Sequence, residues 1–261
     1  MSNTYWQDRD ADAQAKITER TVKQTEKLLA ESYRNSANKI IEEFEATYDK
    51  LLATIEDGKN PTPADLYKLD KYWQMHNKLN LELRKLGYAQ ERILTKQFLI
   101  EFAEIYEAIQ FNSIEAFTTI NKEGMLQSIN SIWCADGLTW KNRAWTNIDV
   151  LKEMLEEQLT HSVITGKRTS ELKKLLQERF DASFSDADCL VRTEMAHIQT
   201  SAAQQRYKDY GLQEVQVWAD KDERRCEVCG KLHEKKYPIN AQLPIPAHPR
   251  CRCAIIPVVE D

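Results

Sequence analysis

Residues 33–55 read YRNSANKIIEEFEATYDKLLATI, and this stretch carries the pattern that decides the fold class. Its apolar side chains recur in steps of three, four and one, which gathers them on one face of a helix. These side chains are Tyr33, Ala37, Ile40, Ile41, Phe44, Tyr48, Leu51, Leu52 and Ile55. The turn signal Asp57-Gly58 follows directly. The stretch therefore predicts an amphipathic helix that ends before Gly58.

Similar helices are predicted further along the chain. The sequence Thr62-Pro63-Ala64-Asp65 combines a capping hydroxyl, a proline at the first helical position and an acid in the first turn, which marks a helix start. We expect this helix to stop near Gly87. Further amphipathic helices are predicted over 93–109, 146–166, 169–180 and 185–208. The expected fold class is therefore mainly α.

The scarcity of glycine supports the same class. Seven glycines in 261 residues are well below the usual frequency of about 7%. A β-sandwich, a propeller or a glycine-dependent dinucleotide fold is therefore excluded. No apolar run reaches the roughly 18 residues of a membrane span, so we expect no membrane partner. The first residues lack the basic-then-apolar order of a secretory signal, so we expect the protein to be intracellular when it is made.

The predicted organisation has two parts. Residues 1–129 form a helical body that binds partners, and residues 130–261 form a second domain whose tail covers about 212–261. Within the body, residues 5–27 are polar and are expected to be a solvated or partner-ordered arm. Within the tail, two short strands are predicted over 214–218 and 254–259, which makes it a small α+β module.

Other conspicuous residues are interpreted as structural. The three tryptophans Trp133, Trp140 and Trp145 are expected to lock a loop between helical layers. Arg192 and Glu194 do not face each other on a helix, so we expect separate polar contacts rather than catalysis. His197 is expected to be a packed or hydrogen-bonded histidine. Cys134 and Cys189 are expected to be small buried side chains.

The last 36 residues contain four of the six cysteines, with Cys226-x-x-Cys229 separated by eighteen residues from His248-x-x-Cys251. This spacing fits a zinc site in which histidine replaces one cysteine. Four protein ligands leave no open position for water, so the predicted zinc is structural and stabilises the small module. Symmetry favours Cys251 as the fourth ligand, but Cys253 is an open alternative, and His233 is a weaker substitute.

Three other interpretations of the cysteines are less favoured. A disulfide pair conflicts with the missing secretion signal. A thioredoxin-type pair begins a helix in a βαβ unit, whereas Cys226 follows a charged run. A nucleic-acid finger needs a recognition helix after its ligands, where this chain has prolines.

Charge limits what the chain can bind. With 36 basic and 41 acidic residues, the net charge is -5, so general affinity for nucleic acid is not expected. Arg224, Arg225, Arg250 and Arg252 nevertheless flank the predicted ligands. We expect them to form a local patch that binds DNA weakly and without sequence preference, unless neighbouring acids neutralise it.

The order of these motifs resembles a known family. Trp140 and Trp145 precede a helix that ends at Gly166, and Arg192-Thr193-Glu194 follows. Next come Val217-Trp218 with Asp222, Cys226-x-x-Cys229 and His248-Pro249-x-Cys251-Arg252-Cys253. Together they resemble the phage head morphogenesis family, the Mu F-like minor head proteins of tailed bacteriophages, especially those of Gram-positive hosts. The resemblance covers roughly residues 130–257.

This resemblance implies a virion protein inside the head, associated with the portal protein and involved in head assembly and DNA packaging or delivery. Major capsid or scaffolding protein is a further partner that it implies. It supplies no catalytic mechanism, so we expect no enzyme. The alternative is a metal-dependent hydrolase or nuclease that acts on DNA during packaging. That alternative requires an open metal position and a general base.

Overall fold

The computed structural model describes residues 5–55, 61–109, 120–219 and 225–258. Helices make up 73% of it, which confirms the mainly α class with a small α+β module. The helices are α1 (Tyr5–Leu52), α2 (Pro63–Leu66), α3 (Asp70–Ala108), α4 (Lys122–Ile129), α5 (Trp140–Ile164), α6 (Thr169–Asp209) and α7 (Glu227–Leu232). The strands are β1 (Glu214–Trp218), β2 (Lys236–Pro238) and β3 (Ala254–Pro257).

The chain divides into two compact units, each assembled from separate segments. Unit 1 contains the described residues of 1–26, 94–140 and 189–261, and unit 2 contains those of 27–93 and 141–188. Helices α1, α3 and α6 are each divided between the two units, with one part in unit 1 and the other in unit 2. The predicted boundary after residue 129 divides the sequence into two continuous domains, and it stays a prediction.

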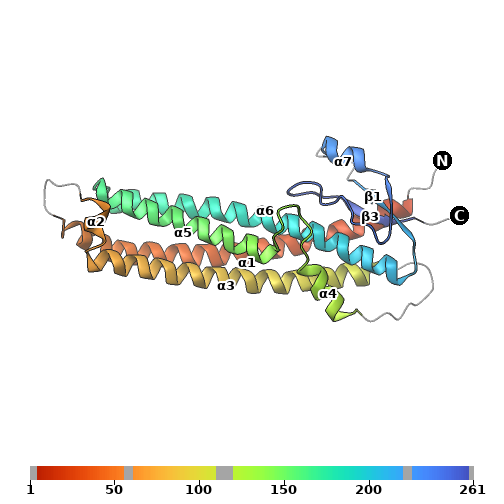
Figure 1. Ribbon diagram of the computed structural model, residues 1–261, viewed down its shortest axis with the longest axis horizontal. Coiled ribbons are helices and arrows are strands. Elements are labelled where there is room, and N and C mark those ends of the chain that lie inside the picture. Colours follow the sequence, from red (N-terminus) through yellow and green to blue (C-terminus); the bar gives the residue numbers. More distant parts are fainter. Residues whose placement is uncertain (1–4, 56–60, 110–119, 220–224, 259–261) are drawn as a thin grey trace. The chain divides into compact units, whose positions relative to one another are not determined.

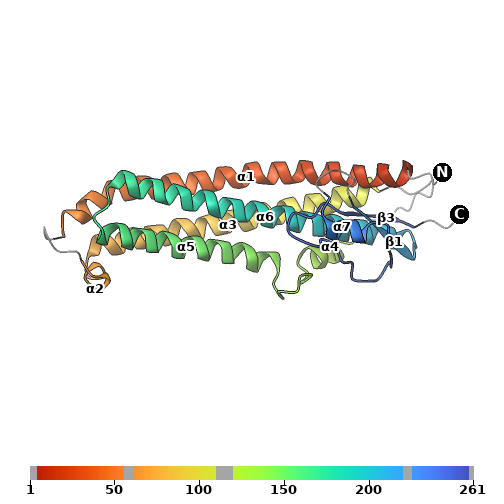
Figure 2. The same cartoon turned by 90° about the horizontal axis from the view of Figure 1, so that it is seen from above.

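Unit 2 consists of antiparallel helical segments from α1, α3, α5 and α6, which run side by side in both views (Figures 1 and 2). Their apolar faces form one core, as the spacing over 33–55 predicts. Tyr48, Leu51 and Tyr72 are fully buried in this core. The hydroxyl of Tyr48 donates to the carbonyl oxygen of Lys167 at 3.1 Å, so the one polar atom of this ring is satisfied.

Gly87 does not end a helix, and this part of the prediction is wrong. It lies inside α3, which runs through both predicted helices without a break. A Cβ atom at Gly87 would come within 2.4 Å of the Trp145 ring of α5. The indole of Trp145 is held in place because it donates to Glu91 at 3.0 Å and packs edge-on against Tyr88. Glycine is therefore needed here for close helix packing rather than for a turn.

Three other predicted boundaries also differ. Helix α2 begins after Thr62 as predicted, but it ends at Leu66. Helix α5 begins at Trp140, before the predicted start at Thr146. Thr146 lies inside the helix, where its hydroxyl donates to the carbonyl oxygen of Asn142 instead of capping the helix. Helix α6 joins the predicted helices 169–180 and 185–208, since no glycine or proline separates them.

Residues 5–27 are not a solvated arm. They form the first part of α1, in which the polar side chains of Gln14, Thr21 and Thr25 are buried within unit 1. Gln14 donates to the Ile255 carbonyl oxygen of β3 at 3.0 Å, and Tyr207 of α6 donates to Asp10. The segment has few apolar residues because it uses hydrogen bonds to contact its neighbours. Sequence periodicity could not reveal this type of packing.

A carboxyl group is buried in the same unit. Glu101 of α3 has no exposed surface, and its contacts are hydroxyls of α1. Thr18 is hydrogen-bonded to one carboxyl oxygen and also lies 2.9 Å from the Gln199 amide oxygen of α6. Burial raises the pKa of Glu101 to about 7, against weaker opposing effects from Thr18, Thr21 and Arg20.

The module at the end of the chain contains a three-stranded antiparallel sheet in the order β2-β1-β3. The predicted strands pair, with Val217 opposite Ile255 and Trp218 opposite Ala254. Strand β2 was not predicted from the sequence, because it is only three residues long. Ala11 of α1 packs in a small apolar cluster with Trp218, Ala254 and Ile256. Among the described residues, no helix is long and apolar enough to cross a membrane.

Candidate metal centre

The first half of the centre is a helix start. Cys226 is the N-cap of α7, and its sulfur accepts a hydrogen bond from the Cys229 amide at 3.3 Å. The Gly230 amide donates to the Cys226 carbonyl oxygen at 2.9 Å. This capping geometry turns the chain so that the sulfurs of Cys226 and Cys229 point to one place.

The second half is a tight turn. The Cys251 amide donates to the His248 carbonyl oxygen at 3.2 Å, which closes a four-residue turn with Pro249 and Arg250 at its centre. Arg250 has a φ of 60°, a left-handed conformation that is unusual for a side chain other than glycine. Proline followed by a positive φ is the pattern of a type II turn.

The two halves meet through their donor atoms. His248 Nε2 lies 3.2 Å from the Cys226 sulfur and 3.1 Å from the Cys229 sulfur, and Cys229 lies 3.7 Å from Cys251. Tetrahedral zinc with bonds of about 2.3 Å to sulfur and 2.0 Å to nitrogen separates two sulfurs by about 3.8 Å and sulfur from nitrogen by about 3.5 Å. The residues therefore fit a metal ion, with the histidine a few tenths of an ångström too close.

The histidine is prepared for binding. Its other ring nitrogen, Nδ1, lies 2.8 Å from the Pro249 carbonyl oxygen. With Nδ1 donating there, Nε2 carries the lone pair toward the sulfurs. This contact also raises the pKa of His248. A backbone partner behind the ligating ring is typical of metal sites in proteins.

Cys253 lies in the same cluster. Cys229, Cys251 and Cys253 are all buried and form a second group that could hold an ion, sharing Cys229 with the group of Cys226, Cys229 and His248. A hydrogen bond from the Cys253 thiol lowers the pKa of Cys251 to about 5, whereas burial raises the pKa of Cys229 to about 12. The structure thus places Cys226 and His248 in one group and Cys251 and Cys253 in the other, with Cys229 in both. The predicted ligand set, and the choice between Cys251 and Cys253, stay predictions.

His233 lies outside both groups. Its Nδ1 accepts a hydrogen bond from the Ala219 amide at 3.2 Å, and its ring packs edge-on against Trp218. It therefore fastens the end of α7 to β1. The pair Cys226-x-x-Cys229 does begin a helix, but the neighbouring strands are antiparallel, so the βαβ setting of a thioredoxin-type pair is missing from the described residues.

The Arg192-Thr193-Glu194 triplet contacts three different segments, as the expectation of separate polar contacts requires. Arg192 pairs with Glu26 and Glu19 of α1. The Thr193 hydroxyl accepts a hydrogen bond from the Arg250 amide at 3.1 Å. Glu194 is buried and accepts from the Trp133 indole at 3.0 Å. Sequence analysis missed the contact between Thr193 and the metal turn, because nothing in the sequence relates two residues 57 positions apart.

The aromatic residues near the triplet have packing roles. The ring of His197 stacks on Trp133 with centroids 4.7 Å apart, and its Nε2 lies 3.2 Å from the Ser131 hydroxyl. Trp140 is buried edge-on against Phe98. These contacts agree with the structural interpretation of both tryptophans and of His197. Cys134 and Cys189 are only half-buried and lie outside the cysteine cluster.

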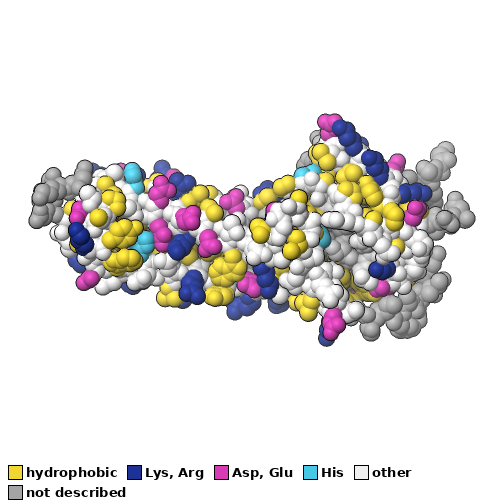
Figure 3. Space-filling model, viewed as in Figure 1, with side chains coloured by type: hydrophobic (Ala, Val, Ile, Leu, Met, Phe, Trp, Pro, Cys, Tyr) yellow, Lys and Arg dark blue, Asp and Glu magenta, His cyan; other side chains and the backbone are white. Residues whose placement is uncertain are grey.

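Arginines surround the centre. Arg225, Arg250 and Arg252 are exposed and line one small hollow together with Cys226, Cys229, His248 and Cys253. Figure 3 shows Lys and Arg side chains gathered over α7. Arg224 lies outside the described residues. Among the acids that neighbour these arginines, Glu227 pairs with Lys231 at 2.6 Å.

The geometry defines the class of protein. It is a mainly helical protein with a small C-terminal module that contains a cluster of cysteine and histidine donors. Comparison with known proteins then gives a family match. Residues 153–256 match the model of the family described as phage Mu protein F like protein. The matched range includes the Arg-Thr-Glu triplet and all five donors. No curated protein and no solved structure matches the chain. This match supports a phage head-related protein, as the resemblance implies, and the Gram-positive hosts stay a prediction.

Proposed function

We propose that the protein is a minor component of the phage head that associates with the portal protein inside the procapsid and takes part in head assembly and DNA packaging or delivery. The observation that carries this proposal is the match of residues 153–256 to the Mu F-like family. Major capsid or scaffolding protein is a second proposed partner. The proposed metal is structural zinc, held by Cys226, Cys229, His248 and Cys251.

The donor set supports a structural metal over the hydrolase or nuclease alternative. A hydrolytic centre needs an open coordination position for water. Here three thiols and one imidazole suffice for a closed tetrahedral shell, and Cys253 supplies a further thiol within the cluster. Soft sulfur ligands are also typical of structural zinc sites. We therefore propose no catalytic role for the centre.

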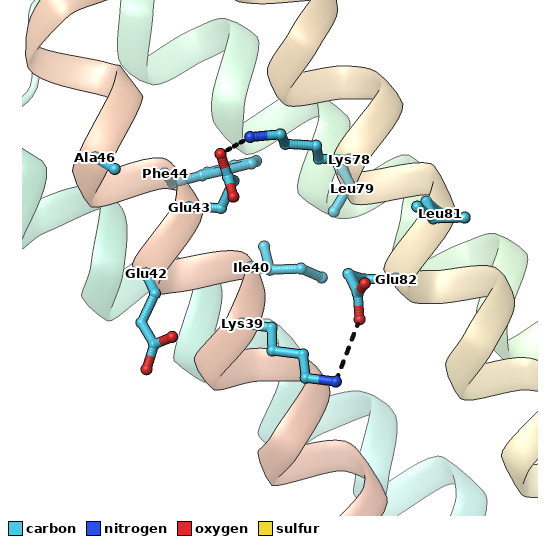
Figure 4. A pocket seen from close by; sticks show the side chains of 10 residues that line it. All are labelled: Lys39, Ile40, Glu42, Glu43, Phe44, Ala46, Lys78, Leu79, Leu81 and Glu82. Atoms are coloured by element: carbon cyan, nitrogen blue, oxygen red, sulfur yellow. Dashed lines mark hydrogen bonds and ion pairs between the residues drawn. The ribbon is translucent and has the colours of Figure 1, made fainter.

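The helical body offers a surface for the proposed partner. In unit 2 a hollow of about 440 Å³ lies between α1 and α3 (Figure 4). Ile40, Phe44 and Leu79 are buried at its base, while Leu81 is 54% exposed. Ion pairs between the two helices, such as Lys39 with Glu82, border it. An apolar base with a polar border is a common form of interface.

Co-purification with the portal protein tests the proposal. We expect the untagged protein to elute with a tagged portal ring from the same phage. Leu81→Asp should reduce the bound fraction about tenfold or more, because it places a charge at the exposed edge of the hollow. Val150→Asp on α5 is the matched control, since Val150 is also exposed and lies in unit 2. A wild-type protein that never co-elutes with portal rings contradicts the association. Equal retention of both variants contradicts only the choice of surface.

A deletion of residues 1–60 is unsuitable for this test. The deletion would remove α1. One part of this helix supplies side chains to the core of unit 2, and another part contacts β3 within unit 1. Substitutions at exposed positions leave these cores intact.

Weak binding to DNA is a separate prediction. Arg225, Arg250 and Arg252 line one hollow, and with Arg224 they could contact up to four phosphates. We expect sequence-independent binding at low salt, with a slope of log K against log salt of at most about 3.6 in magnitude. Titration of labelled duplex should show weaker binding by Arg224→Ala/Arg225→Ala.

Lys68→Ala/Lys174→Ala is the matched control for that titration. It removes the same charge from exposed lysines of unit 2 and should leave binding close to wild type. Identical curves for the arginine variant and wild type would contradict the patch, as would the absence of binding by either protein.

A further inference from the structure

One peptide group lies between the metal turn and α6. It joins Pro249 to Arg250, and it is hydrogen-bonded at both ends. Its carbonyl oxygen accepts from His248 Nδ1 at 2.8 Å, and its amide donates to the Thr193 hydroxyl at 3.1 Å. The same peptide group thus contacts the ring of a proposed metal ligand and a side chain of α6.

The orientation of this peptide group decides where the imidazole points. A type I turn would give Arg250 a φ of about -90° and would turn the central peptide group over. The Pro249 carbonyl would then leave His248 Nδ1, and the Arg250 amide would leave Thr193. The observed φ of 60° corresponds to the other orientation, which an L-residue adopts only when its surroundings hold it there.

Thr193 is well placed to hold it. Its hydroxyl proton is used within α6, where it donates to the Cys189 carbonyl oxygen at 2.7 Å. A lone pair of the same oxygen therefore remains to accept from Arg250. The flanking residues Arg192 and Glu194 contact α1 and Trp133, which restrains this turn of α6.

We propose that Thr193 is a positioning residue for the metal, acting through the Pro249–Arg250 peptide group to aim His248 Nε2 at the cysteine sulfurs. The inference rests on the proposed metal centre and adds a residue on α6 to it. It also explains why a side chain as bulky as arginine can occupy the left-handed position of the turn. The bond from Thr193 stabilises the orientation for which glycine would otherwise be favoured.

Zinc affinity of the full-length protein tests the inference by competition with a chromophoric chelator. Thr193→Val keeps the shape of the side chain and removes the acceptor, so zinc should bind about 10- to 100-fold more weakly, as for other partners behind metal ligands. Thr193→Ser keeps the hydroxyl and should stay near wild type. Thr193→Val/Arg250→Gly should regain most of the loss, because glycine adopts the positive φ without strain.

Thr200→Val is the matched control. Thr200 is buried on the same helix, and its hydroxyl donates to the Ala196 carbonyl oxygen in the same way. It should bind zinc like wild type. The absorption spectrum of bound cobalt gives a second readout, because a displaced imidazole changes the ligand field in Thr193→Val but not in Thr200→Val.

The outcomes separate the inference from the metal centre itself. Wild-type affinity and an unchanged cobalt spectrum in Thr193→Val would overturn the positioning role while leaving the metal in place. Equal losses in Thr193→Val and Thr200→Val would also overturn it, since they would indicate general loosening of α6. A wild-type protein that binds neither zinc nor cobalt would refute the centre, and the inference with it.

Discussion

Cys229→Ser is expected to abolish zinc binding and to unfold residues 225–258, while the helices of unit 2 stay folded. Cys229 belongs to both groups of donors, so its loss affects every possible ligand set. The module is small: its three short strands bury only a few apolar side chains, such as Val215, Val217 and Ile255, so we expect the metal to supply much of its stability. Zinc stabilises small peptides of this kind by about 10–16 kcal/mol at neutral pH, which is comparable to the stability of a whole domain.

Metal content and amide hydrogen exchange measure this effect. Wild type should carry close to one zinc per chain, with X-ray absorption showing four protein ligands and no bound water. In Cys229→Ser, and similarly in Cys226→Ser, exchange should become fast over 225–258 and stay slow in unit 2. Cys134→Ser is the control, because Cys134 lies outside the cluster. Zinc-free wild type with a protected module would contradict the prediction, and a bound water would favour the hydrolytic alternative.

The same measurement decides the fourth ligand. If Cys251 binds the metal, Cys251→Ser should lose zinc and Cys253→Ser should keep it with reduced affinity, since the Cys253 thiol then only donates to Cys251. The reverse result would assign Cys253.

The second large effect concerns Glu101, whose replacement by glutamine should stabilise unit 1 above neutral pH. Burial raises the pKa of Glu101 from 4.5 to about 7. Below pH 4.5 both the folded and the unfolded chain keep the proton, so stability is unaffected. Between pH 4.5 and 7 only the unfolded chain releases it, and the free energy of unfolding falls as pH rises. A difference of one pKa unit between the folded and the unfolded chain corresponds to about 1.4 kcal/mol, so the free energy of unfolding falls by about 3 kcal/mol.

Urea unfolding at pH 4.5 and pH 8 measures that fall. Glu101→Gln should lack this contribution, so its advantage over wild type should grow from pH 4.5 to pH 8. Glu104→Gln is the control, because Glu104 is partly exposed and pairs with Arg20 on α1. If wild type and Glu101→Gln keep the same difference in stability at both pH values, the carboxyl does not titrate as proposed.

The helical class could be predicted from sequence because it rests on periodicity, which is a local property. The same periodicity placed the core of unit 2 correctly. It failed at Gly87, because glycine serves there as the contact point for Trp145 of another helix. It failed again over 5–27, because polar contacts such as that from Gln14 to β3 leave no apolar pattern.

The candidate centre was more predictable than the helices around it. The spacing of Cys226, Cys229 and His248 constrains the chain directly, so it could predict that these donor atoms lie close together, as they do. The contacts around these donors could not be predicted. The support from Thr193 depends on how α6 packs against the turn, and the place of His233 depends on the edge of β1.

The division of the chain into interleaved segments sets an order for folding on the ribosome. Every segment of unit 2 has been made once residue 188 is synthesised, whereas unit 1 also needs the residues that follow. Asp8, near the start, meets Trp218 only 210 residues later. A nascent chain can therefore complete unit 2 first, whereas the contacts of α1 with the sheet, such as that from Gln14 to β3, form only after the sheet is made. Asp8 and Gln14 are thus synthesised early and reach their partners in the sheet late.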